Sequence, residues 1–592
     1  MSSPGLFGLA AISGKRVDEL LVANDSLLRR VEDIRARRAA AKMRDIDPTL
    51  PDISRTHNLF VDAQYKPMVK MAFEYVKFQS NTGQGVLGNQ VTFQVQHAGD
   101  FFSDICGHYA LSGFSANAQA LPARSVGSSS APAVFPTDGK DANGNTLAGA
   151  FYQLVDSDGT QYTTGNYQNH VYMCDYTGER LQENTRFDIS TSPLDAYDDI
   201  TAAFERKFHV SQDKMAGYCR GVGQEVPLTG YDTLSTSTFS DDDSSNTPSA
   251  VVPASRKMRK QVKILNGNQT PQTSFGVTHI WNKHHFNFAN DFALAFPSVC
   301  VPSTQRVLTV TLAAQNKLAF EYPNLHLRTI SDNGANRVVT HSPIFTKAGI
   351  STIAVNQMEI YVNNIFIEPE IHDIYIQRVG FSLIRVFRQH KQTISQANVD
   401  IHLSQLKWPT EYIMMGFRPT WNTNANNNDQ GRDWHMMCKM FNGSMNHSEE
   451  YSVQTAGGAN AAAGTFKLTR PVAGKYAHPV RVASNLTLSS FGNTLYDNFD
   501  TSFFNHHMPL QFGKHTIVTP EDPGALLICY ATHPGEMHGP SGYLNITRAR
   551  EFYARVASDY IGSNSPVELI AIGKALNFML INNGSAILRF NT

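Results

Sequence analysis

The sequence predicts an all-β protein made of more than one sandwich or barrel. Three observations indicate this class. Short β-branched runs alternate apolar and polar residues, 41 Gly and 27 Pro supply turns, and no regular succession of strand and long helix is visible. A chain of 592 residues exceeds one ordinary domain. We therefore expect two β domains in tandem.

The first 50 residues are set apart by a helical pattern. Between residues 14 and 44, apolar side chains recur every three or four positions, at Val17, Leu20, Leu21, Leu27, Leu28, Val31 and Ile34. The second half of this stretch is basic, and cations near a helix C-terminus are favourable in any helix. Two interpretations stay open: a helix packed on its own protein, or an arm that docks on an acidic partner or an anionic membrane.

Strand patterns follow the prolines at positions 48 and 51. The expected strands are residues 91–95, 307–312, 358–366, 381–386, 525–530 and 586–590. Short helices are expected near 195–204 and 549–556. Loops rich in Gly, Ser, Ala or Asn are expected at 122–149, 228–253, 422–431 and 456–464. The second loop suggests a division into an N-terminal segment (1–50), a first β domain (51–255) and a second (256–592).

Charge and cysteine content limit the partners. The 50 basic and 51 acidic residues nearly cancel, whereas a protein that coats nucleic acid normally has a basic excess, so we expect no direct nucleic-acid binding. Near-neutrality favours association with other copies. The six cysteines show no metal-type spacing, and neither a secretory leader nor an 18-residue apolar run is visible. These features indicate a reduced protein made in the cytoplasm.

No motif predicts catalysis, a metal or a cofactor. Gly83, Gly85 and Gly88 match a dinucleotide-binding spacing, but a strand pattern follows them where such a site needs a helix. The pairs His284-His285 and His506-His507 would point to opposite faces of a strand. His533 and His538 would need further zinc ligands.

The carboxylate pairs and the tryptophans also have structural explanations. Glu368 with Glu370, and Glu449 with Glu450, are explained by solvated turns or surfaces. The tryptophans Trp408, Trp421 and Trp434 are expected to pack in a core rather than bind sugar. We therefore predict no catalytic, cofactor-binding or metal-binding residue.

Eighteen short segments occur in the same order as in a known family. The most specific are Arg378-Val379 with Phe381-Ser382-Leu383-Ile384-Arg385-Val386, Leu406-Lys407-Trp408-Pro409, Arg418-Pro419-Thr420-Trp421-Asn422 and Arg432-Asp433-Trp434-His435. The others lie at 66–67, 73–75, 99–102, 107–108, 176–181, 186–188, 206–208, 222–226, 297–302, 361–364, 369–372, 522–525, 540–542 and 585–589. From about Thr56 to Thr592 the chain resembles the major capsid proteins of African swine fever virus and its amoeba-infecting relatives among the nucleocytoplasmic large DNA viruses.

The resemblance implies two tandem eight-stranded jelly-roll sandwiches with long inserted loops and an N-terminal helical base segment. It implies that three chains form a pseudo-hexameric homotrimer, and that these capsomers tile the icosahedral shell of a virion assembled in the host cytoplasm. Implied partners are neighbouring capsomers, minor capsid and penton proteins, the inner viral membrane through the N-terminal segment, and a folding chaperone.

Within the motifs, individual residues are expected to have structural roles. Gly178 and Gly542 should serve turns, Trp408 and Trp421 should be packed, and Arg385 or Arg432 should pair with buried carboxylates. The alternatives are a jelly-roll carbohydrate-binding protein, or a minor or penton capsid protein. Penton and minor proteins are usually single, shorter jelly rolls, so the length of this chain disfavours them.

Overall fold

The computed structural model describes most of the chain between residues 71 and 590, together with part of one N-terminal helix. The described residues are 29, 31–42, 71–81, 85–121, 150–155, 165–190, 192–224, 238–239, 250–251, 273–302, 304–322, 324–332, 337–344, 346–369, 376, 380–424, 430–455, 464–514, 516–536, 539–547, 551–582 and 584–590. The chain divides into two compact units, Met1–Met71 and Ala72–Thr592. In the first unit, residues 31–40 are helical, as the sequence predicts.

The first sandwich consists of two four-stranded antiparallel sheets. Its outer sheet has the order β1-β19-β3-β14, and its inner sheet has the order β10-β9-β15-β2. The strands are β1 (Met71–Gln79), β2 (Gln90–Gln94), β3 (Phe101–Leu111), β9 (Gln182–Ile189), β10 (Ser192–Asp198), β14 (Thr278–Lys283), β15 (Arg306–Leu312) and β19 (Val355–Ile367).

The second sandwich repeats this plan. One sheet runs β20-β30-β22-β27 and carries two short additional strands, β28 and β31, while the other runs β21-β29-β25-β26. The strands are β20 (Phe381–Ile394), β21 (Asp400–His402), β22 (Pro409–Pro419), β25 (Asn485–Ser490), β26 (Asn493–Asp500), β27 (Ala525–Cys529), β28 (Leu544–Asn545), β29 (Phe552–Ala557), β30 (Val567–Asn582) and β31 (Ser585–Leu588).

Strand order identifies both sandwiches as jelly rolls. If the eight main strands of each sandwich are numbered along the chain, one sheet is ordered 1-8-3-6 and the other 2-7-4-5, in both sandwiches. The predicted double jelly roll is therefore confirmed. The expected count of eight strands per roll is not confirmed as a total, because in the described residues the sheets of the second roll hold six and four strands.

The predicted boundary near residue 255 is wrong. β14, β15 and β19 all follow that position, yet they pair with β3, β2 and β9 of the first sandwich. The chain passes from the first sandwich to the second between Ile367, at the end of β19, and Phe381, at the start of β20. The composition of the loop at 228–253 predicts a domain boundary there. A jelly roll, however, closes by pairing its last strand with its first and third strands, and local composition does not reveal this pairing.

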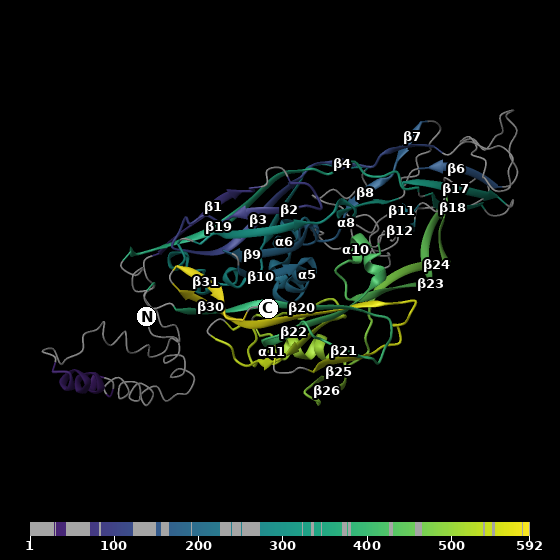
Figure 1. Ribbon diagram of the computed structural model, residues 1–592. Helices are drawn as coiled ribbons and strands as arrows, with labels where there is room; N and C mark the ends of the chain where they lie inside the picture. Colours follow the sequence, from purple (N-terminus) through teal and green to yellow (C-terminus); the bar gives the residue numbers. More distant parts are fainter. Residues whose placement is uncertain are drawn as a thin grey trace, which may run out of the picture. The chain divides into compact units, whose positions relative to one another are not determined.

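Figure 1 shows the layers of the larger unit. The outer sheet of the first sandwich (β1, β19, β3) is followed by the inner sheet (β9, β10), by helix α5, by the sheet with β20 and β22, and by the sheet with β25 and β26. The alternation of apolar and polar residues explains why these segments form strands with one buried face. In β15, for example, every second residue is buried and the others are partly exposed. The resulting core is continuous across both sandwiches.

Smaller elements lie on this framework. The helical ones are α4 (Thr177–Leu181), α5 (Asp199–His209), α6 (Gln212–Gly221), η2 (Asn287–Ala289), η3 (Phe292–Leu294), η4 (Ser298–Cys300), α8 (Gln315–Leu318), η5 (Thr420–Thr423), α10 (Gln430–Asp433), the π-helical η6 (Phe503–His507) and α11 (Met508–Phe512). The paired short strands are β4 (Phe114–Ser115) with β13 (Ser274–Phe275), β5 (Ala118–Ala120) with β7 (Asn166–Gln168), β8 (His170–Met173) with β16 (Ala319–Tyr322), and β11 (Thr238–Phe239) with β12 (Ala250–Val251).

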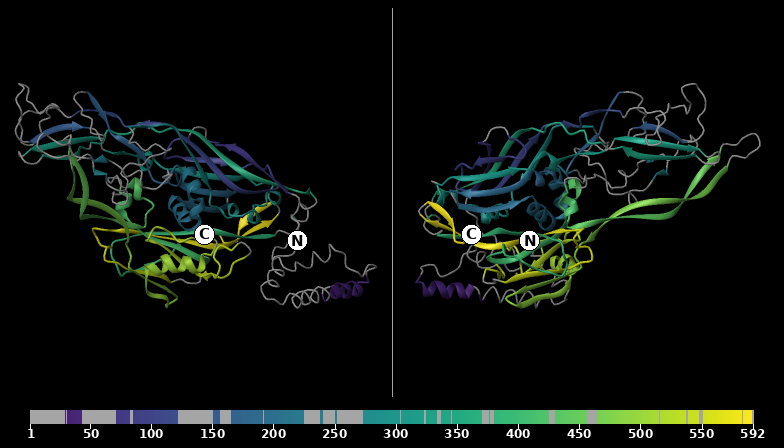
Figure 2. Two further views of the ribbon diagram at one scale, coloured as in Figure 1. Left: turned by 180° about the vertical axis from the view of Figure 1, so that it is seen from behind. Right: turned by 45° about the vertical axis from the view of Figure 1, so that its right-hand side comes forward.

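Two larger insertions extend from the same end of the unit (Figures 1 and 2). One is the sheet β18-β17-β6, formed by Arg337–Ile344, Leu325–Asp332 and Ala150–Val155. The other is the hairpin of β23 (Cys438–Thr455) and β24 (Gly464–Arg481). The sequence suggested only loops around 456–464, so the hairpin was not foreseen. The loop at 122–149 and most of the one at 228–253 lie outside the described residues.

The six expected strands are all present, at β2, β15, β19, β20, β27 and β31. The expected helix at 195–204 begins later, at Asp199, because residues 192–198 form β10 and Asp198 caps the helix. The expected helix near 549–556 is wrong. Phe552, Ala554 and Val556 are buried on one face of β29, with the period of a strand.

Candidate assembly site at the seam between the sandwiches

Helix α5 fills the space between the two sandwiches. Residues 200–208 are all buried, and they include Glu205, Arg206 and Lys207. Asp198 begins the helix by accepting a hydrogen bond from the Thr201 N–H at 2.9 Å. Charged groups removed from water are costly unless they are paired, so each of these three residues is expected to have a partner, either in its own sandwich or in the other one.

Lys207 crosses to the second sandwich. Its Nζ lies 2.6 Å from Asp522 Oδ2 and also donates to the His435 carbonyl oxygen. Asp522 additionally accepts from the N–H groups of Met437 at 2.7 Å and Gly524 at 3.0 Å. Burial alone would raise the pKa of Asp522, but Lys207 and these N–H groups outweigh it and hold the pKa below its ordinary value. The pair is therefore a fully buried and well-satisfied link.

The end of β10 makes a second set of links. Asp195 Oδ1 accepts from the Phe387 N–H at 3.0 Å, and Asp198 pairs with Lys391 and with the amide of Gln389. Glu205 lies 3.6 Å from the ammonium of Lys574. Burial raises the pKa of Asp195 to about 7, since Lys574 and the backbone donors only partly offset the loss of water.

The segment that contains α10 forms a third set. Trp434 is 1% exposed, and its Nε1 donates to the Asp175 carbonyl oxygen at 2.6 Å. The backbone N–H of Asp175 in turn donates to the Gly431 carbonyl oxygen at 2.7 Å. In the first sandwich, Arg206 pairs with Glu179 at 2.7 Å. These contacts explain why a motif at 432–435 is structural: it fastens one roll to the other.

The expected structural residues have mixed outcomes. Arg385 forms a buried two-bond ion pair with Glu411, at 2.6 and 3.1 Å, as predicted. Trp408 is buried beneath the Arg388 guanidinium, which lies 3.4 Å from the ring centroid. Trp421 is 58% exposed, so its predicted packing is wrong. Gly178 lies in helix α4 rather than in a turn, and a Cβ there would come within 2.7 Å of Ile280.

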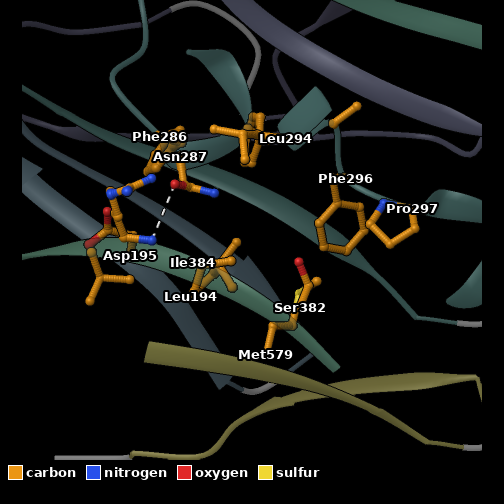
Figure 3. A pocket seen from close by; sticks show the side chains of 14 residues that line it. Leu194, Asp195, Phe286, Asn287, Leu294, Phe296, Pro297, Ser382, Ile384 and Met579 are labelled. Atoms are coloured by element: carbon orange, nitrogen blue, oxygen red, sulfur yellow. Dashed lines mark hydrogen bonds between the residues drawn. The ribbon is translucent and has the colours of Figure 1, made fainter. Parts of the chain in front are cut away.

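A small cavity lies beside the seam (Figure 3). Its volume is about 20 Å³, which is room for roughly one water molecule. The backbone N–H of Arg385 donates to Asn287 Oδ1 at 3.2 Å across this region. Side chains of both sandwiches line the cavity, including Leu194, Phe296, Ser382 and Met579. A space of this size does not accommodate a sugar or a nucleotide.

The histidine pairs do not form metal sites in the described part of the chain, where no group of three or more His, Cys, Asp or Glu side chains is placed to hold an ion. His284 is buried, and its Nδ1 lies 3.0 Å from the Tyr197 hydroxyl. Burial, helped by His285, lowers the pKa of His284 to about 3. His506 and His507 lie on a π-helix rather than on a strand. His538 lies outside the described residues.

The remaining candidates are structural or not described. Gly88 has a φ of +89° in the turn before β2, which agrees with the predicted turn and strand. Glu370 and the side chains of Glu449 and Glu450 lie outside the described part. The six cysteines are free thiols. No helix among the described residues is long and apolar enough to cross a membrane.

The fold and the seam define a class: double jelly-roll proteins whose two rolls pack into one compact unit with a shared core. Comparison with curated sequences gives the particular family. Over its full length the chain is 35% identical to the hexon protein p72 of African swine fever virus, and the alignment covers all of that protein. It is equally similar to the major capsid protein of a second isolate of this virus. The chain belongs to this family of major capsid proteins of large DNA viruses.

Solved structures agree. The Faustovirus major capsid protein is 32% identical, with a TM-score of 0.74, and the match covers 96% of this chain and 100% of that one. The capsid protein in the PBCV-1 capsid shares the fold, with a TM-score of 0.51 at 15% identity over 90% of this chain and all of that one. No family model matches the sequence.

Proposed function

We propose that this chain is a shell-building subunit that forms homotrimeric, pseudo-hexameric capsomers, and that these tile the outer icosahedral shell of a large DNA virus. The observation that carries the proposal is the repeated strand order. Two rolls with the same 1-8-3-6 and 2-7-4-5 sheets stand side by side in each chain. Three chains around a threefold axis would therefore supply six similar sandwiches, and six sandwiches make a near-hexagonal tile.

The stacking of the sheets supports a closed ring. Within the chain, the 2-7-4-5 sheet of the first roll faces the 1-8-3-6 sheet of the second across α5. The opposite pair of faces, on β1-β19-β3-β14 and β21-β29-β25-β26, is left at the two outsides. One of these faces belongs to a 1-8-3-6 sheet and the other to a 2-7-4-5 sheet, the same two kinds of sheet that meet within the chain. They therefore suit a head-to-tail contact between copies, which we propose closes after three copies.

Exposed apolar residues support association. Phe73 is 60% exposed and Tyr75 50% exposed on β1, and Trp281 is 42% exposed on β14. All three belong to the outer sheet of the first roll. Large apolar side chains gathered on one face of a protein indicate a protein–protein interface.

The other partners follow from the family and from composition. We propose that the N-terminal helix, whose basic residues Arg35, Arg37 and Arg38 follow one another along residues 31–40, faces the inside of the shell. There it would meet minor capsid proteins or the inner viral membrane. We further propose contacts with neighbouring capsomers and penton proteins, assembly in the host cytoplasm with the help of a chaperone, no direct nucleic-acid contact and no catalytic activity.

A mass measurement tests the proposal. Size-exclusion chromatography with light scattering on the purified chain should give a stable particle of three times the 65.5 kDa chain mass at micromolar concentration. A well-behaved monomer would overturn the trimer. A glycan array tests the carbohydrate-binding alternative, which is weakened because Trp408 and Trp434 are buried in the structure.

A further inference from the structure

The second roll contains an exposed counterpart of helix α5. In the first roll, α5 directly follows the fifth strand, β10. In the second roll the fifth strand is β26, and it is followed by a helix over residues 501–512, made up of η6 and α11 with two preceding helical residues. The two helices therefore occupy the same place in the order of the fold.

Burial differs sharply between these two helices. The nine residues 200–208 of α5 are all buried, because the second roll covers the helix. The 501–512 helix buries Phe504, Asn505 and Met508 against its own roll. It exposes His506, His507 and Leu510, and Leu510 is 78% exposed. An apolar side chain so fully in water, on a helix whose counterpart is covered, suggests a missing covering surface.

The contacts of α5 indicate which surface that is. Glu205 of α5 pairs with Lys574 on β30, Thr201 bonds Gln389 on β20, and His209 lies 3.2 Å from the Tyr412 hydroxyl on β22. α5 thus packs across strands one, eight and three of a 1-8-3-6 sheet. The other 1-8-3-6 sheet, β1-β19-β3-β14, lies at the outside of the first roll.

We infer that the 501–512 helix of one copy docks on the outer face of β1-β19-β3-β14 of a second copy, and so reproduces between chains the contact that α5 makes within one. This inference rests on the proposed trimer and deepens it. Repeated around a threefold axis, the contact would alternate with the intrachain seam. All six junctions between sandwiches would then be built on the same plan.

The receiving face has the chemistry of an interface centre. The Trp281 ring stacks on His108 at 4.1 Å between centroids, and Tyr361 lies 5.2 Å from Trp281. This aromatic group spans β14, β3 and β19 and would receive the apolar side chain of Leu510. The Lys77–Glu359 pair at 3.0 Å lies on the same sheet, where it would give the aromatic centre a polar border.

The test uses the head-to-tail nature of the contact. Leu510→Glu damages the helix side only, and Trp281→Glu damages the sheet side only. Each variant alone should run at the mass of one chain. An equimolar mixture should give a particle of twice the chain mass, because the intact helix of the Trp281→Glu variant can dock on the intact sheet of the Leu510→Glu variant.

A matched control is available on β31. Ile587 is apolar and 53% exposed, but it lies on neither face, so Ile587→Glu should remain a trimer. Circular dichroism and a melting curve establish that each variant is folded. If Trp281→Glu unfolds because it disturbs His108, Phe73→Glu on the exposed part of β1 replaces it, and Leu510→Ser similarly replaces Leu510→Glu.

The outcomes separate the two proposals. A trimeric wild type with monomeric single variants and a two-chain mixture supports the inference. A Leu510→Glu variant that stays trimeric with unchanged affinity overturns the docking mode and leaves the trimer standing. A wild type that is monomeric overturns the trimer itself.

Discussion

The seam between the two rolls should depend strongly on Lys207. Substitution Lys207→Met keeps the length of the apolar stem but removes the ammonium, so Asp522 is left ionised, 3% exposed and without its countercharge. Breaking a buried pair in this way costs about 3–5 kcal/mol. Because Asp522 retains the N–H groups of Met437 and Gly524, we expect the lower end, about 3 kcal/mol.

The expected melting shift follows from the size of the unit. At about 2.1 cal/mol/K per residue, a cooperative unit of about 500 residues loses about 3 °C for 3 kcal/mol. Differential scanning calorimetry or urea unfolding of the purified chain measures it. The double variant Lys207→Met/Asp522→Asn should recover more than half of the loss, because the unpaired charge is gone while an acceptor for the backbone donors remains. A Lys207→Met variant as stable as wild type, or a double variant with simply additive losses, would refute this account of the seam.

Four further predictions concern pH, packing and assembly. Asp195→Asn should raise the melting temperature relative to wild type more at pH 8 than at pH 5. The folded pKa of Asp195 is raised from 3.8 to about 7, so its contribution to stability is full below the unfolded pKa and is lost progressively as the pH rises from there through 7. Because the folded pKa of His284 is lowered to about 3, the free energy of unfolding should fall as the pH drops below 6.5, by at most about 1.4 kcal/mol per pH unit. In the His284→Gln variant, the free energy of unfolding measured with urea should depend less on pH between 6.5 and 4. Gly524→Ala should prevent folding, because its Cβ would lie 1.9 Å from the Met437 carbonyl oxygen. As a control, the Cβ of Gly217→Ala in α6 would meet no atom within 4 Å, so this variant should raise the free energy of unfolding by up to about 1 kcal/mol. Soluble yield and melting curves compare the two variants. Deleting residues 1–45 should leave trimers intact in light scattering but impair shell formation in an assembly assay, and loss of the trimer would show that the segment clasps subunits.

Local pattern was sufficient for most strands. The run at 307–312 alternates β-branched and other residues, and the structure has β15 there with alternating burial. The same rule, applied more strictly, would have identified β29, where Phe552, Ala554 and Val556 recur every second residue. The helix expected near 549–556 rests on a short helical periodicity, and over so few residues a period of 3.6 is hard to tell from a period of 2.

What the sequence could not show depends on contacts between distant residues. Lys207 and Asp522 are 315 positions apart, and no spacing rule links them. Loop composition predicts a division between the rolls near residue 255, whereas the division is set by the pairing of β19 with β3. Resemblance to a family indicates the motif at 432–435, but only the contact between Trp434 and Asp175 shows that it fastens the two rolls together.

Assembly of the purified wild-type chain tests the central claim most directly. Single-particle electron microscopy of the oligomer should show three copies in a ring of six sandwiches with a near-hexagonal outline. A particle with twofold symmetry, or one whose rolls do not alternate around the ring, would contradict it.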